Sequence, residues 1–345
     1  MAATNYPTFV GVAEANQLDQ ALDRIAQALV DRRAQFLFGA GMSHGSNLPL
    51  GSDLAVALLR RFFPGMNTPS DERLKTLAVE FPLESIVYAV EQKPGLKRDD
   101  LTRVLREIFI NPNPAPNEGH HAFMSLLGVP PRISAVFTTN YDTLLEQVLG
   151  PDFAVAITEK NATNIDQERD GGKIPVIYLR GNLDGDYEIT EREIGSEKFR
   201  LLHEELKIAL HRADAFVFVG YSLSDIDFRQ IYRRFLDQLK DRKATGKTTY
   251  FVSPPKDEFS YTLGKAIWQL RQAEWIPLDS KSFFTRLNDV VKNRFLADIT
   301  AEVKKKYAVN DTEMKALIER TAKLWRMDTQ DALLFLYEAR SRIGG

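Results

Sequence analysis

The hydrophobic positions along the chain follow two periodicities, which predict helices and strands in turn. Apolar residues at three- and four-residue spacings predict an amphipathic helix over residues 18–34. Short apolar runs without that spacing predict buried strands at residues 36–38, 134–138, 175–179, 216–219 and 248–252. Helical segments separate these strands. The alternation predicts an α/β fold with a doubly wound, mostly parallel, Rossmann-like sheet.

Two stretches depart from this alternation. Residues 71–109 show helical patterns broken by prolines, which predicts a helical insertion at about residues 65–130. Beyond about residue 280 only helices are predicted. We therefore expect a main domain at residues 1–280 and a C-terminal helical extension at residues 281–345. The extension is either a surface cap or a contact for an oligomer or partner, and the pattern leaves both open.

The composition narrows the class of protein. Of the 345 residues, 44% are hydrophobic and 27% are charged, as in an ordinary globular protein. The formal net charge of -2 gives no basis for expecting direct nucleic-acid binding. The chain has no cysteine, which excludes disulfides, cysteine-ligated zinc and thiol nucleophiles. No signal-peptide pattern and no long apolar run is present, so we expect a cytoplasmic protein without a membrane partner.

A small-residue turn follows the first predicted strand. Gly39, Ala40 and Gly41 come directly after the apolar run, and a helix is predicted from Asp53. Glycines allow a sharp turn and close approach to a ligand, and a turn before a helix can offer N–H groups to a phosphate. The same residues also fit a tight turn that binds nothing, so this motif alone does not decide between the two.

Polar side chains follow two other predicted strands. Asn140 and Asp142 come after the second strand, and Ser222 and Asp225 come after the fourth. The carboxyl ends of parallel strands form the edge at which open α/β sheets bind ligands. Asp142, Ser222 and Asp225 are also placed to cap the helices that follow, so capping stays an alternative for each. A further turn, Asp184–Gly185, predicts a hairpin with residues 187–190 as its return strand.

Four motifs together resemble those of the sirtuin-like (SIR2-type) NAD-hydrolase family of bacterial anti-phage defence systems. They are FGAGMS with LPLGSDL (residues 38–43 and 48–54), FTTNYDTLLE (137–146), YLRGNLDG (178–185) and VGYSLSD (219–225). The resemblance covers roughly residues 18–277. The lack of cysteine agrees with it, because protein-deacylating sirtuins carry a four-cysteine zinc module. The resemblance implies NAD as substrate and no zinc or other metal.

The resemblance also implies roles for single residues. It assigns binding of NAD or ADP-ribose to Gly39, Ala40, Gly41, Ser43, Pro49, Thr139, Gly220, Ser222 and Asp225. Cleavage of the nicotinamide–ribose bond passes through an oxocarbenium-like state, as glycoside hydrolysis does. Asn140 is suited to hold the ribose hydroxyls or the attacking water, because its amide both donates and accepts. Asp142 either stabilises the positive charge on the sugar or caps its helix.

Arg180 departs from the family pattern, which has a histidine at this position. Histidine can take a proton near pH 7, whereas arginine stays protonated and offers only donors. Three alternatives stay open: impaired catalysis, a base supplied from elsewhere such as His44, and an engineered replacement that traps ligand. We nevertheless place Arg180 with Asn140 and Asp142 among the candidate catalytic residues.

The leading interpretation is an NAD hydrolase that acts as the toxic effector of a defence complex. The alternative is a catalytically impaired NAD- or ADP-ribose-binding scaffold or regulatory subunit for a partner ATPase or nuclease. A protein deacylase is disfavoured, because both the zinc module and the histidine are missing. The resemblance implies a HerA-like ATPase or an Argonaute-like partner. We also expect a homo-oligomer, joined through residues 71–109 or the C-terminal helices.

Overall fold

The computed structural model describes residues 12–64, 70–110, 113–127, 132–190, 193, 196–221, 246–255, 257–270, 273–307 and 312. Within them, seven strands form one sheet: β1 (Ala34–Phe38), β2 (Val136–Thr138), β3 (Ala154–Ile157), β4 (Ile174–Tyr178), β5 (Ala215–Val219), β6 (Thr248–Val252) and β7 (Glu274–Ile276). Their order is β3-β4-β2-β1-β5-β6-β7, and every neighbouring pair is parallel. The predicted α/β class with a parallel sheet is confirmed.

The strand order reverses at the centre of the sheet. The chain adds β2, β3 and β4 on one side of β1, then crosses back to add β5, β6 and β7 on the other. Phe38, the last residue of β1, pairs with Thr138 of β2 and with Val219 of β5. The carboxyl ends of β1 and β5 therefore flank the topological switch point, where open α/β sheets bind ligands.

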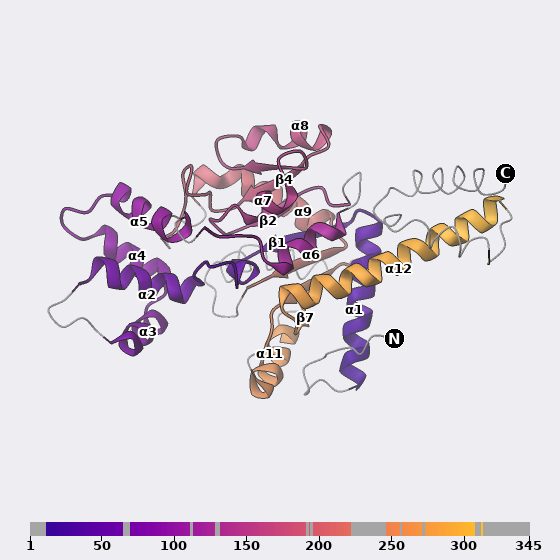
Figure 1. Cartoon of the computed structure of the whole chain (residues 1–345), viewed down its shortest axis with the longest axis horizontal. Helices are drawn as coiled ribbons and strands as arrows, with labels where there is room; N and C mark the ends of the chain where they lie inside the picture. The colour runs from indigo at the N-terminus through magenta and orange to yellow at the C-terminus, as the bar shows by residue number, and fades with distance from the viewer. Residues whose placement is uncertain are drawn as a thin grey trace.

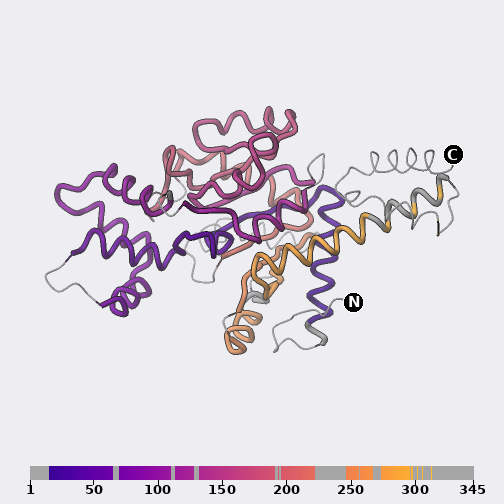
Figure 2. The backbone as a smooth tube through the Cα atoms, in the orientation of Figure 1, coloured from indigo at the N-terminus to yellow at the C-terminus, as the bar shows by residue number. Residues whose placement is uncertain are grey.

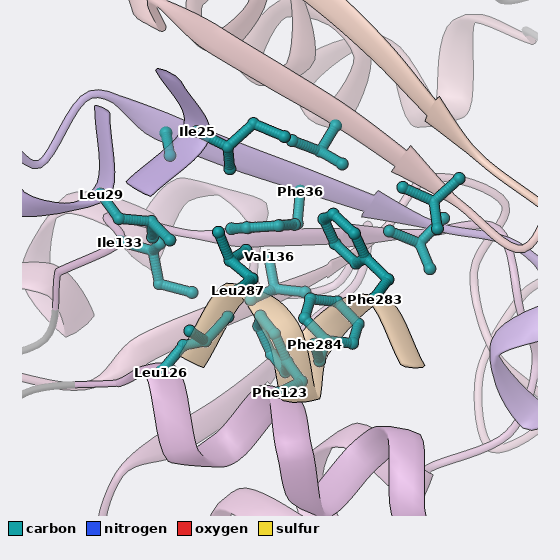
Figure 3. Packing of buried hydrophobic residues seen from close by; sticks show 14 of the residues in the cluster. Ile25, Leu29, Phe36, Phe123, Leu126, Ile133, Val136, Phe283, Phe284 and Leu287 are labelled. Carbon is teal, nitrogen blue, oxygen red and sulfur yellow. The ribbon is translucent and has the colours of Figure 1, made fainter. Parts of the chain in front are cut away.

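One face of the sheet is covered by α1 (Val12–Val30), α6 (Glu118–Leu126), α7 (Leu144–Leu149) and α12 (Ser280–Tyr307) (Figure 1). Aromatic rings fill the centre of this layer, as Figure 3 shows. Phe123 of α6 lies 4.9 Å from Phe38 and 5.2 Å from Phe284 of α12 between ring centroids. The first of these pairs is edge-to-face, an arrangement that adds about 0.5–1.5 kcal/mol beyond area burial. Hence α6 and the first turns of α12 pack into the main core.

The other face is covered by η2 (Ala162–Asn164), α8 (Ile165–Asp170), η3 (Glu197–Phe199) and α9 (Arg200–Arg212). Leu202, Leu206 and Leu210 repeat at four-residue spacing along α9 and pack against Phe137 and Phe216 of the sheet. Next to the β7 edge lies α11 (Glu258–Leu270). Helices on both faces make the sheet doubly wound, as predicted.

The predicted helical insertion forms a lobe at one end of the molecule, which Figure 2 shows as a backbone trace. It contains α3 (Asp71–Glu80), α4 (Leu83–Glu91) and α5 (Arg98–Ile110), together with α2 (Gly51–Phe62), which precedes the predicted limit at residue 65. α6 lies within the predicted limits but packs on the sheet instead. The apolar side chains of α2, α4 and α5 form a separate core cluster. That cluster also contains Tyr141 from the loop after β2 and Leu183, Tyr187 and Ile189 from the loop after β4. The insertion is thus packed directly against two loops of the sheet edge.

Some predicted elements differ from the structure. The return strand at residues 187–190 is wrong: only a single antiparallel bridge joins Gly181 and Tyr187. Within that range the Tyr187 carbonyl accepts from Arg98 of α5 and the Glu188 carbonyl accepts from Tyr141, so side chains and not a neighbouring strand bond these groups. The helix predicted after Asp225 lies outside the described residues, as do nearly all of residues 308–345. The domain limits at residues 65–130 and 280 stay predictions.

Candidate active site

The loop after β1 lies against the loop after β5. Gly39 ends the strand, and η1 (Ala40–Ser43) follows. The Gly41 amide donates to the Gly220 carbonyl at 2.9 Å, and the Gly39 amide donates to Val219 at 2.9 Å. A Cβ on Gly41 would lie 2.8 Å from the Gly220 backbone. Close packing of the two loops therefore requires glycine here. These two amides bond within the protein, so they are not the free N–H groups expected to face a phosphate.

Gly220→Ala is expected to destabilise the fold by about 2 kcal/mol or more. Gly220 has φ +78°, and an added Cβ would lie 2.4 Å from the Met42 nitrogen, a backbone atom that cannot swing away. Urea unfolding measures the effect. Gly51→Ala, at the start of α2 with open space around its Cβ, is the control and is expected to be near neutral. Equal stability of the Gly220 variant and the unmodified chain would contradict the packing argument.

Three of the predicted site residues meet at the carboxyl edge of the sheet. Ser43 Oγ donates to Asp142 Oδ2 at 2.8 Å. Asn140 Nδ2 lies 3.2 Å from the Gly39 carbonyl and 3.3 Å from Ser43 Oγ. The loop after β1 and the loop after β2, about 100 residues apart in sequence, are thereby joined by polar side chains. Their position beside the switch point is the one predicted for a ligand site.

Asp142 makes the helix-capping contact that the sequence left open, while its role toward the sugar stays a prediction. Its Oδ1 accepts from the Leu144 amide at 3.2 Å, at the start of α7, while its Oδ2 accepts from Ser43. Burial raises the pKa of the Asp142 carboxyl, and the hydrogen bonds from Ser43, Leu144 and Asn140 oppose that rise. The result is a half-buried acidic group held in one orientation beside Asn140.

Tyr221 joins the loops after β1, β2 and β5, and its role was not predicted. Its hydroxyl lies 2.8 Å from Thr139 Oγ1 and donates to the Phe38 carbonyl at 3.1 Å. Its ring lies against Gly39, where an added Cβ would come within 2.9 Å. Thr139 is buried and its amide also donates to Phe38. The sequence feature that could have predicted this role is the position of Tyr221 between Gly220 and Ser222 in the fourth motif.

Asn117 anchors the far end of the glycine loop and was also missed. Its Nδ2 donates to the Met42 and His44 carbonyls, each at 2.8 Å. Its Oδ1 accepts from the His120 amide at 3.1 Å, which caps α6. The Asn117 amide in turn donates to His120 Nδ1 at 3.2 Å. A helix-capping asparagine three residues before a histidine was the available signal.

The buried imidazole of His120 makes stability depend on pH. Burial lowers the pKa of His120 from 6.5 to about 4, so the folded protein disfavours the charged ring. As the pH falls, the unfolded chain therefore takes up this proton at a higher pH than the folded chain does. The free energy of unfolding is therefore expected to fall, by up to about 3 kcal/mol from this group, as the pH drops from about 6.5 to 4.

Urea unfolding at several pH values tests this expectation. His120→Asn, which keeps an acceptor near the Nδ1 position, should lose less stability between pH 6.5 and 4 than the unmodified chain does. His121→Asn, at the adjacent exposed position, is the control: it removes only the smaller cause of the pKa shift, the charge of His121, leaves His120 buried, and should keep most of the loss. Identical pH slopes for the two variants would show that His120 is not the group responsible.

Arg180 lies beside the same group of residues. It lies two residues after the end of β4, is 5% exposed, and its guanidinium carbon lies 5.7 Å from the centroid of the Tyr141 ring. Tyr141 stands between Asn140 and Asp142 in the chain, and its hydroxyl donates to the Glu188 carbonyl at 2.5 Å. The Glu188 amide donates to the Arg180 carbonyl at 2.8 Å. A permanent positive charge is thus buried next to the turn that carries Asn140.

Side chains of the insertion hold the loop that follows Arg180. Arg106 Nε and Nη2 both donate to the Leu183 carbonyl, at 2.8 and 2.6 Å. Arg98 donates to the Tyr187 carbonyl at 3.1 Å and stacks its guanidinium over the Tyr187 ring at 4.3 Å. Thr102 Oγ1 lies 2.7 Å from the Tyr187 hydroxyl. Helix α5 therefore fixes the loop after β4.

The remaining predicted site residues are less closely connected with this group. Pro49 is half-buried in the segment before α2, and His44 is exposed. Ser222 and Asp225 lie outside the described residues.

Among the residues that the structure describes, no group of three or more histidine, aspartate or glutamate side chains is arranged to hold a metal ion. In the same part of the chain, no helix is long and apolar enough to cross a membrane.

Residues 134–273 match the family model described as the SIR2-like domain. Over this range, which is less than half of the chain, the sequence resembles the SIR2-like family. The matched range includes Asn140, Asp142, Arg180 and Gly220, and the predicted resemblance to the SIR2-type family is thus confirmed. The SIR2-like chain is also 25% identical over 293 residues to the NAD(+) hydrolase ThsA of Acinetobacter baumannii (strain 532279).

That alignment covers 79% of the SIR2-like chain and 56% of ThsA, so the chain spans little more than half the length of this curated relative. A solved structure of a Sir2 point mutant with a p53 peptide and NAD is also similar to the SIR2-like chain. The two share 16% identity with a TM-score of 0.41, and the match covers 79% of this chain and 97% of that one.

Proposed function

We propose that the protein binds NAD at the carboxyl edge of its sheet and hydrolyses the bond between nicotinamide and ribose. The observation that carries the proposal is the joined group of Ser43, Asn140 and Asp142 beside the switch point. Similarity to an NAD(+) hydrolase supports the choice of substrate. The nucleotide is proposed to contact residues 39–43, Pro49, Thr139, Asn140, Gly220, Ser222 and Asp225.

The proposed reaction needs little from the protein beyond placement and charge. Water adds to the ribose C1, the electrons of the C1–N bond leave with neutral nicotinamide, and one proton is released. Asn140 is proposed to hold the water or the ribose hydroxyls, since its amide can donate and accept. Asp142, when ionised, stabilises the positive charge that develops on the sugar. Neither residue needs to act as a nucleophile.

Arg180 supports a second candidate function. A guanidinium cannot accept a proton, but it binds phosphate and ribose oxygens well. Because this permanent charge is buried beside Tyr141, the protein is alternatively an NAD- or ADP-ribose-binding module with little or no turnover. In that case it acts as a scaffold or regulator of a partner ATPase or nuclease.

The wider setting is proposed on the resemblance and on the relative's name. We propose a cytoplasmic effector of anti-phage defence that forms a homo-oligomer through the insertion or the C-terminal helices. A HerA-like ATPase or an Argonaute-like protein is the proposed partner. Light scattering that gives the 39.1 kDa mass of one chain would refute the homo-oligomer.

The purified protein should be incubated with NAD, alone and with the products of neighbouring genes, and released nicotinamide measured by chromatography. Calorimetry with ADP-ribose measures binding separately. Nicotinamide release supports the hydrolase, whereas binding without release supports the second candidate. Absence of both at millimolar ligand would refute the site. Asn164→Ala, at an exposed position on the other face of the sheet, is the control for non-specific effects of substitution.

A further inference from the structure

A buried tyrosine hydroxyl beneath the Asn140 turn has more acceptors around it than it has protons. Tyr178, the last residue of β4, is fully buried and reaches α7 across the sheet face. Its Oη lies 2.6 and 2.7 Å from the two carboxyl oxygens of Glu146, and 2.9 Å from the Asp142 carbonyl. Burial and Glu146 raise the pKa of Tyr178 well above 10, so the hydroxyl keeps its one proton.

One O–H cannot donate to both Glu146 and Asp142. If Glu146 is ionised, the phenol proton goes to the carboxylate, because a charged acceptor makes the stronger hydrogen bond. The Asp142 carbonyl then faces a lone pair of Tyr178. If Glu146 carries a proton, its O–H donates to Tyr178 Oη, and the Tyr178 hydroxyl donates to the Asp142 carbonyl. Only the protonated form satisfies all of the groups.

The charges around the pair favour the protonated form. Burial raises the pKa of Glu146 to about 7, the Tyr178 hydrogen bond opposes that rise, and the nearby Asp142 carboxyl adds to it. The other acidic group that faces Tyr178 is Asp184, from the loop after β4. The carboxyl of Glu146 therefore changes its charge within the neutral pH range.

We propose that Glu146 and Tyr178 form a proton-dependent latch on the turn that carries Asn140 and Asp142. With Glu146 protonated, the Asp142 carbonyl is held and the turn is fixed. Loss of the proton releases that carbonyl, adds a negative charge next to Asp142, and loosens the turn. The two are positioning residues, since they act through the turn. Their effect on catalysis rests on the proposed NAD hydrolysis, whereas their effect on the turn does not.

The test compares the unmodified chain with Glu146→Gln between pH 5.5 and 8.5. The glutamine amide donates to Tyr178 Oη as the protonated acid does, and it cannot ionise. Hydrogen exchange of peptides covering residues 139–144, corrected for intrinsic rates, reports the turn without any ligand. Nicotinamide release reports catalysis. In the unmodified chain we expect protection and release both to fall about 2–10-fold through pH 7, the value of one hydrogen bond.

In Glu146→Gln both quantities are expected to stay level through pH 7. Tyr178→Phe, which removes only the hydroxyl, should show the low protection at every pH. A pH step that is absent from the unmodified chain, or that persists in Glu146→Gln, overturns the latch. A step in exchange with no matching step in release overturns the link to catalysis. If the unmodified chain releases no nicotinamide at any pH, the proposed hydrolysis fails, while a step in exchange still supports the latch.

Discussion

Replacing Arg180 by histidine is expected to raise NAD cleavage by about 10²–10⁴-fold, the usual contribution of a general base. The position lies two residues after β4, beside the turn that carries Asn140, so an imidazole there is well placed to take a proton from water or ribose. Arginine cannot do this, because its guanidinium stays protonated. Nicotinamide release at pH 7 measures the gain, and an ADP-ribose titration on the same samples measures binding.

Arg180→Gln is the matched control for this experiment. It removes the buried positive charge without supplying a base, so its rate should stay near that of the unmodified chain. An equal gain in both variants would mean that charge repulsion of the oxocarbenium-like state, not a missing base, limits the reaction. If histidine weakens ADP-ribose binding and yields no cleavage, Arg180 anchors the ligand and the second candidate function is favoured.

Asn140→Ala is expected to lower any NAD cleavage at least about 10²-fold, in the unmodified chain and in Arg180→His alike. A base has little effect unless water and ribose are held in place. Misplacement of the reacting groups by an ångström can lower the rate about 10²-fold. The same change removes the Asn140 hydrogen bonds to Gly39 and Ser43. The measurement is single-turnover nicotinamide release with enzyme in excess.

A structural effect of Asn140→Ala has to be separated from a catalytic one. Ser43→Ala provides the comparison, because it removes the hydroxyl that joins the two loops and leaves the Asn140 amide in place. A much smaller loss of release in Ser43→Ala than in Asn140→Ala is expected. Similar losses in the two would indicate that joining the loops, not contact with substrate, is the main role of Asn140.

The central strands were predictable because they are buried on both faces. β1 and β5 are nearly uninterrupted apolar runs flanked by turn residues, which is the pattern of a parallel strand covered by helices. β6 consists of β-branched and aromatic residues, which favour strands. β3 and β7 lie at the two edges of the sheet, and β7 has only three residues, of which Glu274 is exposed. The pattern of β7 hardly differs from that of a loop. β3 is apolar throughout, but two of its four residues are alanine, which is uncommon in strands.

The candidate site was predictable to the extent that strand ends determine it. Asn140, Asp142 and the glycine loop follow parallel strands, and topology alone brings them to one edge. Asn117, Tyr221 and Glu146 were missed because their roles depend on which backbone groups they reach across tertiary contacts. The Gly39 and Gly41 amides were assigned to a phosphate because the sequence does not show that the loop after β5 would accept their hydrogen bonds.

The aromatic layer over β1 has a consequence for the nascent chain on the ribosome. Phe36 leaves the ribosome early, but Phe284, which packs against it at 5.8 Å, follows 248 residues later. At roughly 5–20 residues per second, this face of β1 stays exposed for about 10–50 s before Phe284 of α12 has been synthesised. Phe36 and Phe38, which stack side by side on this face of β1, stay accessible to chaperones and to other nascent chains throughout that interval. Ribosome-bound chains from which α12 has not yet emerged should therefore be chaperone substrates, and chains from which it has emerged should not.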